Sequence, residues 1–193
     1  MSHDAIADSE MAVRHCAQQI IDLIASVGAD RARLLDGLRA PLAALLQRPN
    51  LLELGVKREG NHIDNSKYLY YDGQLVMTMD QFPKGKRIPP HDHGVWEALC
   101  LYAGSVEHTV YERRDDGATP GFADLALIEH RILHKGDISI VAPPAEVHGF
   151  TALADETWSL TVVGGHYKPV RHYFDPEQKS YVQRRPKALQ PAA

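Results

Sequence analysis

Residues 85–104 read GKRIPPHDHGVWEALCLYAG and contain two histidines one residue apart, His91 and His93, followed by Glu97. In a β-strand alternate side chains share a face, so an extended segment here would bring both imidazoles together. Two imidazoles and a carboxylate are three ligands of a divalent-metal site. A second stretch, 136–148 (GDISIVAPPAEVH), ends in His148 and offers a third imidazole. The sequence therefore predicts a scaffold that joins these two segments around one metal.

The composition argues against several functional classes. The chain has 193 residues, 21 of them basic and 25 acidic, and a formal net charge of −4. The basic residues are scattered, so we expect no nucleic-acid partner. No apolar run approaches the roughly 20 residues that cross a bilayer, and the N-terminus lacks the basic and apolar regions of a signal peptide. We expect a cytoplasmic protein, monomeric or homodimeric, with no membrane partner and a small-molecule substrate.

The first 50 residues carry helical periodicity. Apolar residues recur at three- and four-residue steps over 9–27, with Ser9 as a candidate cap. A second amphipathic stretch follows a candidate N-cap at Asp30, and Pro41 is expected to kink or split it because proline removes a backbone donor. We assign 1–51 to a helical portion that packs on the outside of a β-rich body.

From about residue 52 the pattern changes to short β-like runs between turn residues. Strands at a spacing of about 8–12 residues predict an all-β sandwich or barrel. The predicted strands are 67–71, 75–82, 95–103, 107–113, 124–134, 138–142, 147–153 and 157–163. We assign 52–180 to this body and 181–193 to a loose tail.

The glycines around the histidines form a recognisable pattern. The positions that match the first cupin motif are Gly85, His91, His93, Glu97 and Gly104, and 136–148 resembles the second motif. The resemblance implies a cupin double-stranded β-helix, an antiparallel jelly-roll barrel with one metal in its mouth. The expected fold class is therefore an all-β core with N-terminal helices.

The predicted metal-binding set consists of His91, His93, His148 and Glu97. Neutral imidazoles suit Fe, Ni, Cu, Zn or Mn, and three of them leave open positions on a six-coordinate metal. O₂ and a substrate could bind there together. Glu97 is either a fourth ligand or an acceptor that orients an imidazole or a bound water.

Among cupins, the chain resembles the thiol dioxygenases, the group of cysteine dioxygenase and 3-mercaptopropionate dioxygenase. The resemblance rests on HDHGVW at 91–96, on helices before the barrel, and on WSLTVVGGHYKPVRHYFDP at 158–176. It implies a mononuclear Fe(II) cofactor, with Mn, Ni or Zn as alternative metals. It also implies that O₂ is added to a small thiol to give a sulfinate.

The chain departs from that family at several positions. Glu97 stands where those enzymes carry cysteine or glycine. Their Ser-x-His-x-Tyr triad would fall on Ser159, Thr161 and Val163, so only the serine matches, and His166 or Tyr167 could substitute only through a folded-back loop. We take Ser159 and His166 as candidate catalytic residues. The substrate-binding candidates are Lys67, Tyr70, Arg87 and Trp96.

Three function classes remain open from the sequence. The first is the Fe(II)-dependent dioxygenase. The second is an isomerase, lyase or decarboxylase that uses its metal as a Lewis acid with Glu97 as base. The third is a small-ligand-binding cupin without catalysis. His108 also lies in a predicted strand, but its spacing is not ligand-like, so we leave it outside the site.

Overall fold

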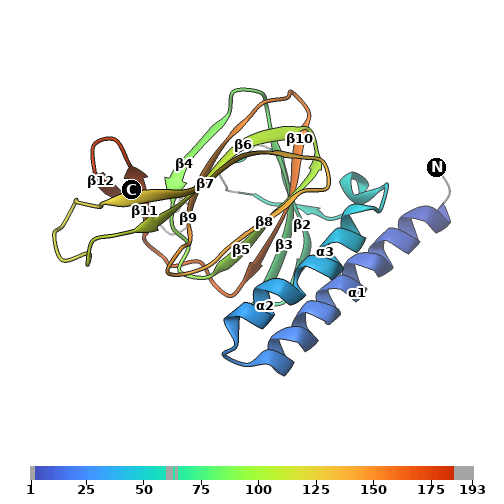
Figure 1. Cartoon of the computed structure of the whole chain (residues 1–193). Coiled ribbons are helices and arrows are strands. Elements are labelled where there is room, and N and C mark those ends of the chain that lie inside the picture. Colours follow the sequence, from blue (N-terminus) through green and yellow to red (C-terminus); the bar gives the residue numbers. More distant parts are fainter. Residues whose placement is uncertain (1–2, 60–62, 64, 185–193) are drawn as a thin grey trace.

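Two antiparallel sheets face each other and three helices lie against one of them, as Figure 1 shows for the computed structural model. The structure describes residues 3–59, 63 and 65–184, with only the backbone given for His3 and Asp4. The helices are α1 (His3–Val27), α2 (Arg31–Gly37) and α3 (Arg39–Leu46), followed by a 3-10 turn at Leu51–Glu53.

Twelve strands form the sheets. They are β1 (Val56–Lys57), β2 (Ser66–Tyr71), β3 (Leu75–Phe82), β4 (Arg87–His91), β5 (Trp96–Ala103), β6 (Ser105–Arg113), β7 (Leu125–His134), β8 (Ile138–Val141), β9 (Val147–Ala152), β10 (Thr157–Gly164), β11 (Arg171–Asp175) and β12 (Ser180–Arg184). One sheet has the order β1-β2-β3-β10-β5-β8 and the other β12-β11-β4-β9-β6-β7. The predicted all-β core with N-terminal helices is confirmed, and the two antiparallel sheets are consistent with a jelly-roll barrel.

The helices cover the outer face of the sheet that contains β3, β10 and β5. Ile20 of α1 and Leu42 of α3 are fully buried, and they belong to one apolar cluster with Met77 and Leu160 of the sheet. Burying a side chain of this size stabilises the fold by about 1.5–3 kcal/mol relative to exposure. The outward face of this sheet is therefore part of the core.

The helical portion differs from the prediction at its start. Ser9 is buried inside α1, because the helix begins at His3, so Ser9 does not cap it. Asp30 caps α2 as predicted, accepting a hydrogen bond from the Arg33 amide at 3.1 Å. The break falls at Leu38, one turn before Pro41. This place is expected, since a proline removes the bond to the carbonyl four residues earlier.

Four strands escaped the sequence pattern, namely β1, β4, β11 and β12. β4 contains Pro89 and Pro90, which ordinarily argue against a strand, and it pairs with β9 through an irregular register. β11 and β12 are rich in polar residues and are held by pairing with each other. In the expected loose tail, residues 181–184 belong to β12, and 185–193 lie outside the described residues.

The space between the sheets is filled at one end by an apolar cluster. Phe82 of β3 and Phe150 of β9 meet there edge to face, with ring centroids 5.0 Å apart. Ile88 and Leu99 pack into the same cluster. These four side chains also line a cavity of about 410 Å³, so the cluster forms one wall of the space in which the histidines lie.

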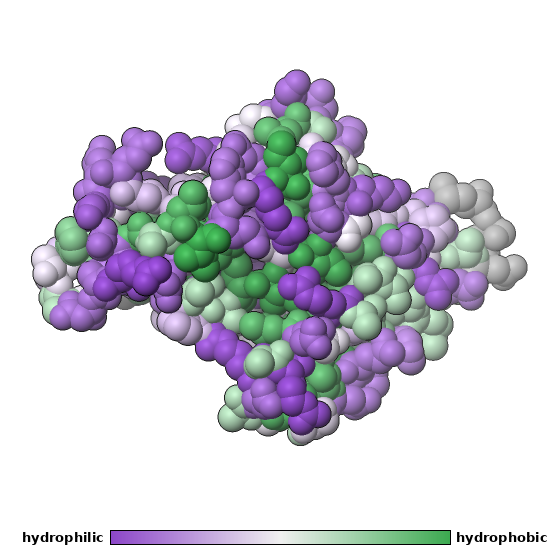
Figure 2. Space-filling view, viewed as in Figure 1, coloured by the Kyte–Doolittle hydropathy of each residue, from purple (hydrophilic) through white to green (hydrophobic). Residues whose placement is uncertain are grey.

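The surface is polar over much of the molecule. Figure 2 shows hydrophobic residues in a band across the middle of one face, between the β11–β12 end and the helices. The edge strand β7 carries three exposed apolar side chains, Leu127, Ile128 and Ile132. None of the helices in the described part of the chain is long and apolar enough to span a membrane.

Candidate metal centre

Three buried histidines from different parts of the barrel form one group. His91 ends β4, His93 follows it in the turn to β5, and His148 lies on β9 directly opposite His91. Each offers a ring nitrogen, and these nitrogens lie within 4.8 Å of one another. The arrangement brings the two sequence segments together around one point.

His93 reaches the group through a turn and not through strand alternation. β4 ends at His91, and Gly94 adopts a positive φ of 78°, a conformation that glycine adopts without steric cost. The carboxylate of Glu146 accepts hydrogen bonds from the backbone amides of His93 and Gly94. Glu146 lies two residues before His148. The segment that contains His148 therefore fixes the turn that contains His93.

In each of the three rings, Nδ1 lies close to a polar atom outside the group. His91 Nδ1 lies 2.9 Å from the Pro89 carbonyl, His93 Nδ1 lies 2.9 Å from Glu97 Oε2, and His148 Nδ1 lies 3.1 Å from His108 Nε2. With the proton on Nδ1, each Nε2 carries a lone pair. Nε2 of His93 and Nε2 of His148 lie 3.2 Å apart. Lone pairs at this distance repel, and a cation between them would attract both, so the donor set fits a metal ion.

The electrostatics also favour neutral imidazoles. Burial, and then the neighbouring His148 and His93, hold the pKa of His91 well below its ordinary value. Burial likewise lowers the pKa of His108 to about 3, with His148 acting in the same direction. Neutral imidazole is the form that binds metals. His91 is therefore in the form that binds metals at neutral pH.

Glu97 borders the histidines and is tied to a tyrosine. Its Oε1 lies 3.4 Å from His148 Nε2, and Tyr167 donates its hydroxyl to Oε2 at 2.6 Å. Burial alone would raise the pKa of Glu97, but His93 and His148 lower it well below its ordinary value. Burial, with the Glu97 charge, raises the pKa of Tyr167 well above its ordinary value. The pair is therefore a carboxylate with a neutral phenol donor.

Asp92, between the two histidines, points away from the group. It accepts hydrogen bonds from Lys168 Nζ at 2.7 Å and from the His172 amide at 2.9 Å. The backbone amide of Lys168 in turn donates to the His93 carbonyl at 3.0 Å. These bonds hold the segment that carries Tyr167 against the turn that carries His93.

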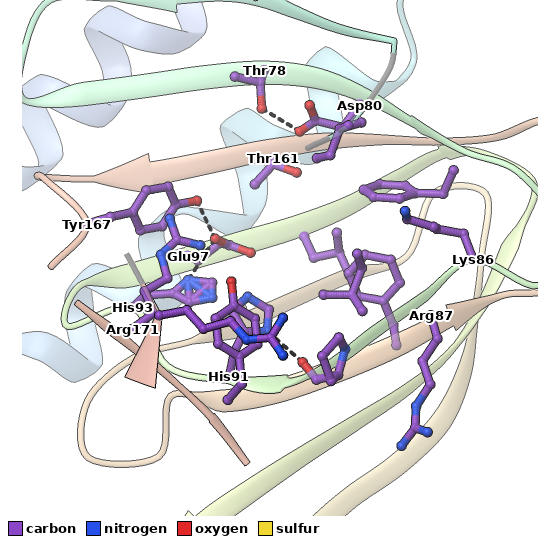
Figure 3. A pocket seen from close by; sticks show the side chains of 18 of the residues that line it. Thr78, Asp80, Lys86, Arg87, His91, His93, Glu97, Thr161, Tyr167 and Arg171 are labelled. Atoms are coloured by element: carbon purple, nitrogen blue, oxygen red, sulfur yellow. Dashed lines mark hydrogen bonds and ion pairs between the residues drawn. The ribbon is translucent and has the colours of Figure 1, made fainter. Parts of the chain in front are cut away.

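His91 and His93 line the cavity, as the close-up in Figure 3 shows. Its lining combines the metal group with charged and apolar residues from both sheets. Besides the histidines, the charged side chains that line it are Arg58, Asp80, Lys86, Arg87, Glu97, Arg171 and Arg184. A cavity of about 410 Å³ falls within the range of roughly 300–1,000 Å³ that is usual for small-molecule sites.

The predicted catalytic residues do not reach the metal group. Ser159 is buried in β10, where its hydroxyl lies 3.2 Å from that of Thr161, and Thr161 rather than Ser159 lines the cavity. His166 is exposed in the segment before β11. Its neighbour Tyr167 enters the site instead, because that segment folds back over the histidines.

Of the four predicted substrate contacts, the structure brings only Arg87 to the cavity. Lys67 donates to the Leu52 carbonyl at 2.6 Å, on the side of the 3-10 turn. Tyr70 and Trp96 pack against the helix-side cluster, and Trp96 lies over Gly164. These three side chains belong to the outer face of their sheet.

His108, Arg171 and Lys86 are site residues that sequence reasoning missed. His108 is completely buried on β6, between the inward-facing Val106 and Val110. A histidine in the buried alternation of an apolar strand was the available signal, since such a group needs a polar partner. Arg171 and Lys86 carry no comparable sequence signal, because charged residues beside turns are usually solvated.

No protein-family model and no curated protein sequence matches the chain. Similar solved structures include a cupin superfamily protein from Desulfitobacterium hafniense, with 14% identity over 62% of this chain and 92% of that chain and a TM-score of 0.41. Another is a mutant of Bacillus subtilis oxalate decarboxylase OxdC, with 16% identity over 67% of this chain and 30% of that chain and a TM-score of 0.40.

A third is hydroquinone 1,2-dioxygenase PnpCD in complex with Cd²⁺ and 4-hydroxybenzonitrile, with 12% identity over 50% of this chain and 61% of that chain and a TM-score of 0.39. The structural neighbours thus include cupin superfamily proteins. The named proteins perform different reactions, and similarity at this level does not select among them.

Proposed function

We propose that the chain is a non-heme Fe(II)-dependent dioxygenase of cupin type that adds O₂ to a small substrate. A thiol oxidised to a sulfinate is the favoured substrate class, as the resemblance to thiol dioxygenases implies. The observation that carries the proposal is the group formed by His91, His93 and His148. In each ring Nδ1 lies within 3.1 Å of a polar atom outside the group, and His91 and His93 line a cavity of small-molecule size.

When bound, Fe(II) would supply a coordination site for O₂ and lower the pKa of a thiol. The chain supplies the rest. His91, His93 and His148 hold the ion, and His108 orients His148. Tyr167 keeps its proton because burial raises its pKa, so its hydroxyl donates to Glu97 at the edge of the cavity.

Glu97 supports a second candidate function. A buried carboxylate that borders His93 and His148 and lines the cavity has the position of a general base. The alternative is therefore an isomerase, lyase or decarboxylase with Mn, Ni or Zn as Lewis acid. Glu97 acts as a base in that reaction and as a metal ligand or hydrogen-bond partner in the first.

Oxygen consumption separates the two. The protein is purified without oxygen, its metal content is measured, and it is reconstituted with Fe(II). A panel of small thiols is then added while O₂ is followed. Thiol-dependent uptake with formation of a sulfinate supports the dioxygenase. No uptake by fully iron-loaded protein with any thiol overturns it.

Two variants link the activity to the histidines. His91→Ala removes a member of the group and should abolish both metal binding and turnover. His130→Ala is the matched control, because His130 is exposed and pairs with Glu107 on the outer surface. Equal metal content in the two variants would contradict the assignment of His91.

A further inference from the structure

We propose that the cavity selects a small dicarboxylate, with one carboxylate held by Arg171 beside His91 and His93 and the other by Lys86 on the opposite side. This inference deepens the proposed function, because it takes the cavity as the substrate site. It rests on the balance of charges around the cavity and on where these charges lie.

The acidic residues of the cavity are already neutralised. Asp80 faces Arg58 at 3.6 Å and accepts hydrogen bonds from Ser66 and Thr78. Glu97 is engaged by the histidines and Tyr167. Neither carboxylate is therefore left to pair with the remaining cations.

Four cations of the lining have no acidic partner. Within residues 3–59, 63 and 65–184, no ion pair and no side-chain hydrogen bond is formed by Lys86, Arg87, Arg171 or Arg184, all of which line the cavity. Like charges that share a partly buried space repel each other and are desolvated at a cost. An anionic ligand would reduce both the repulsion and the desolvation cost, so the cavity favours anions.

Arg171 is set up to bind a planar anion. Its guanidinium stacks on the ring of Tyr167, with Cζ 3.8 Å from the ring centroid. Its buried Nε has no hydrogen-bond partner among the described residues. Stacking fixes the plane of the guanidinium, and a fixed guanidinium can bind a carboxylate through two parallel hydrogen bonds. Figure 3 places Arg171 on the side of Tyr167, Glu97 and His93.

Lys86 lies on the other side of the same cavity in that view and points toward it, and Arg87 lies beside it with its guanidinium turned outward. They are exposed at the start of β4 and stand at its rim. A single carboxylate at Arg171 leaves these two charges unbalanced. A second carboxylate on the same molecule would neutralise them. The distance between the two carboxylates would then have to match the distance between the cations on the two sides of the cavity.

Binding to the protein without turnover tests this. Calorimetric titration uses succinate, butyrate and inorganic phosphate, each against metal-free and Zn²⁺-loaded protein. Succinate should bind about tenfold more tightly than butyrate or better, as expected for one added charge-assisted contact. Equal affinity for succinate and butyrate would overturn the proposal. Phosphate binding as tight as that of succinate would also overturn it, because a compact anion cannot occupy two separated positions.

Variants locate the two positions. Arg171→Gln and Lys86→Gln should each bring the affinity for succinate close to that for butyrate, while Lys84→Gln should leave it unchanged. Lys84 is an exposed lysine of the preceding turn that does not line the cavity. Arg171→Lys keeps the positive charge but loses the planar guanidinium that can form two parallel hydrogen bonds. The affinity of this variant for succinate should therefore be intermediate. If neither Gln variant weakens succinate binding, the proposal is wrong.

The test also separates this inference from the proposed function. Metal content is measured on the same preparations. A protein that binds no metal but still selects succinate refutes the metal-dependent activity and keeps the anion site. A protein that loads iron and oxidises a thiol without preference for dicarboxylates keeps the activity and refutes the anion site.

Discussion

His108 Nε2 on β6 lies 3.1 Å from Nδ1 of His148 on β9, so a completely buried histidine orients a member of the metal group. The other nitrogen of His108 faces Glu129 Oε1 at 3.6 Å. His108 therefore lies between Glu129 and His148, and of these two contacts only the one with His148 is at hydrogen-bond distance. Partners of this kind fix the tautomer and ring orientation of a ligating histidine.

Replacing His108 should therefore weaken metal binding without removing a ligand. We expect His108→Phe to bind Fe(II) or Zn²⁺ about 10–100-fold more weakly, the usual loss for such a partner. Competition with a chromophoric chelator measures this, and circular dichroism checks that the barrel is intact. His130→Phe, on the exposed face of the neighbouring strand β7, is the control. Unchanged metal affinity in a folded His108→Phe protein would contradict this role of His108.

Tyr167 should matter for turnover more than for metal binding. Tyr167→Phe removes the hydroxyl that donates to Glu97 at 2.6 Å but leaves the three histidines in place. Since hydrogen bonds to charged groups contribute about 1.5–3 kcal/mol, we expect kcat to fall about tenfold or more. Tyr173→Phe is a matched control, because Tyr173 lines the same cavity and its hydroxyl has no hydrogen bond among the described residues. Equal losses in the two variants would refute a specific role.

Asp80 should give the stability a distinct pH dependence. Burial raises its pKa above the ordinary 3.8, although hydrogen bonds from Ser66 and Thr78 act in the opposite direction. A raised folded pKa stabilises the fold below the unfolded pKa, and this contribution is lost as the pH rises through the folded pKa. Relative to Asp80→Asn, the metal-free wild-type protein should thus lose unfolding free energy as the pH rises above 3.8.

Urea unfolding of both proteins from about pH 4 to pH 7 measures the difference between them. Other carboxylates titrate equally in the two proteins and cancel in this difference. A difference that grows in favour of the wild type with rising pH would show that the folded pKa of Asp80 is lowered instead.

Gly164 should not tolerate a side chain. A Cβ at this position of β10 would overlap the indole ring of Trp96 on the neighbouring strand β5. Overpacking of this kind typically costs about 1–3 kcal/mol, so Gly164→Ala should lower the free energy of unfolding by that amount. Because the clash is with Trp96, the double variant Gly164→Ala/Trp96→Leu should recover part of the loss. A purely additive double variant would place the cause elsewhere.

Periodicity was sufficient to locate most of the fold. Helical spacing around Cys16 and Ile20 predicted α1, and alternation in 75–82 predicted β3, because burial on one or both faces leaves a pattern in the chain. β4 left no such pattern. Its two prolines forfeit backbone donors, and the strand exists because β9 and β11 lie on either side of it.

The sequence by itself was sufficient to group the three histidines of the candidate site. His91, His93 and His148 could be named because ligand spacing is local, and each motif needs only its own few residues. The tertiary structure alone decided what surrounds them. His108, Tyr167, Arg171 and Lys86 come from distant parts of the chain, and no local pattern places them beside the histidines or the cavity. Their roles depend on which strand faces which across the barrel, and on the fold-back of the segment before β11. The histidines of the candidate site can thus be recognised from the sequence. The residues that contact them, and the cations around the cavity, come together only when the two sheets pack against each other.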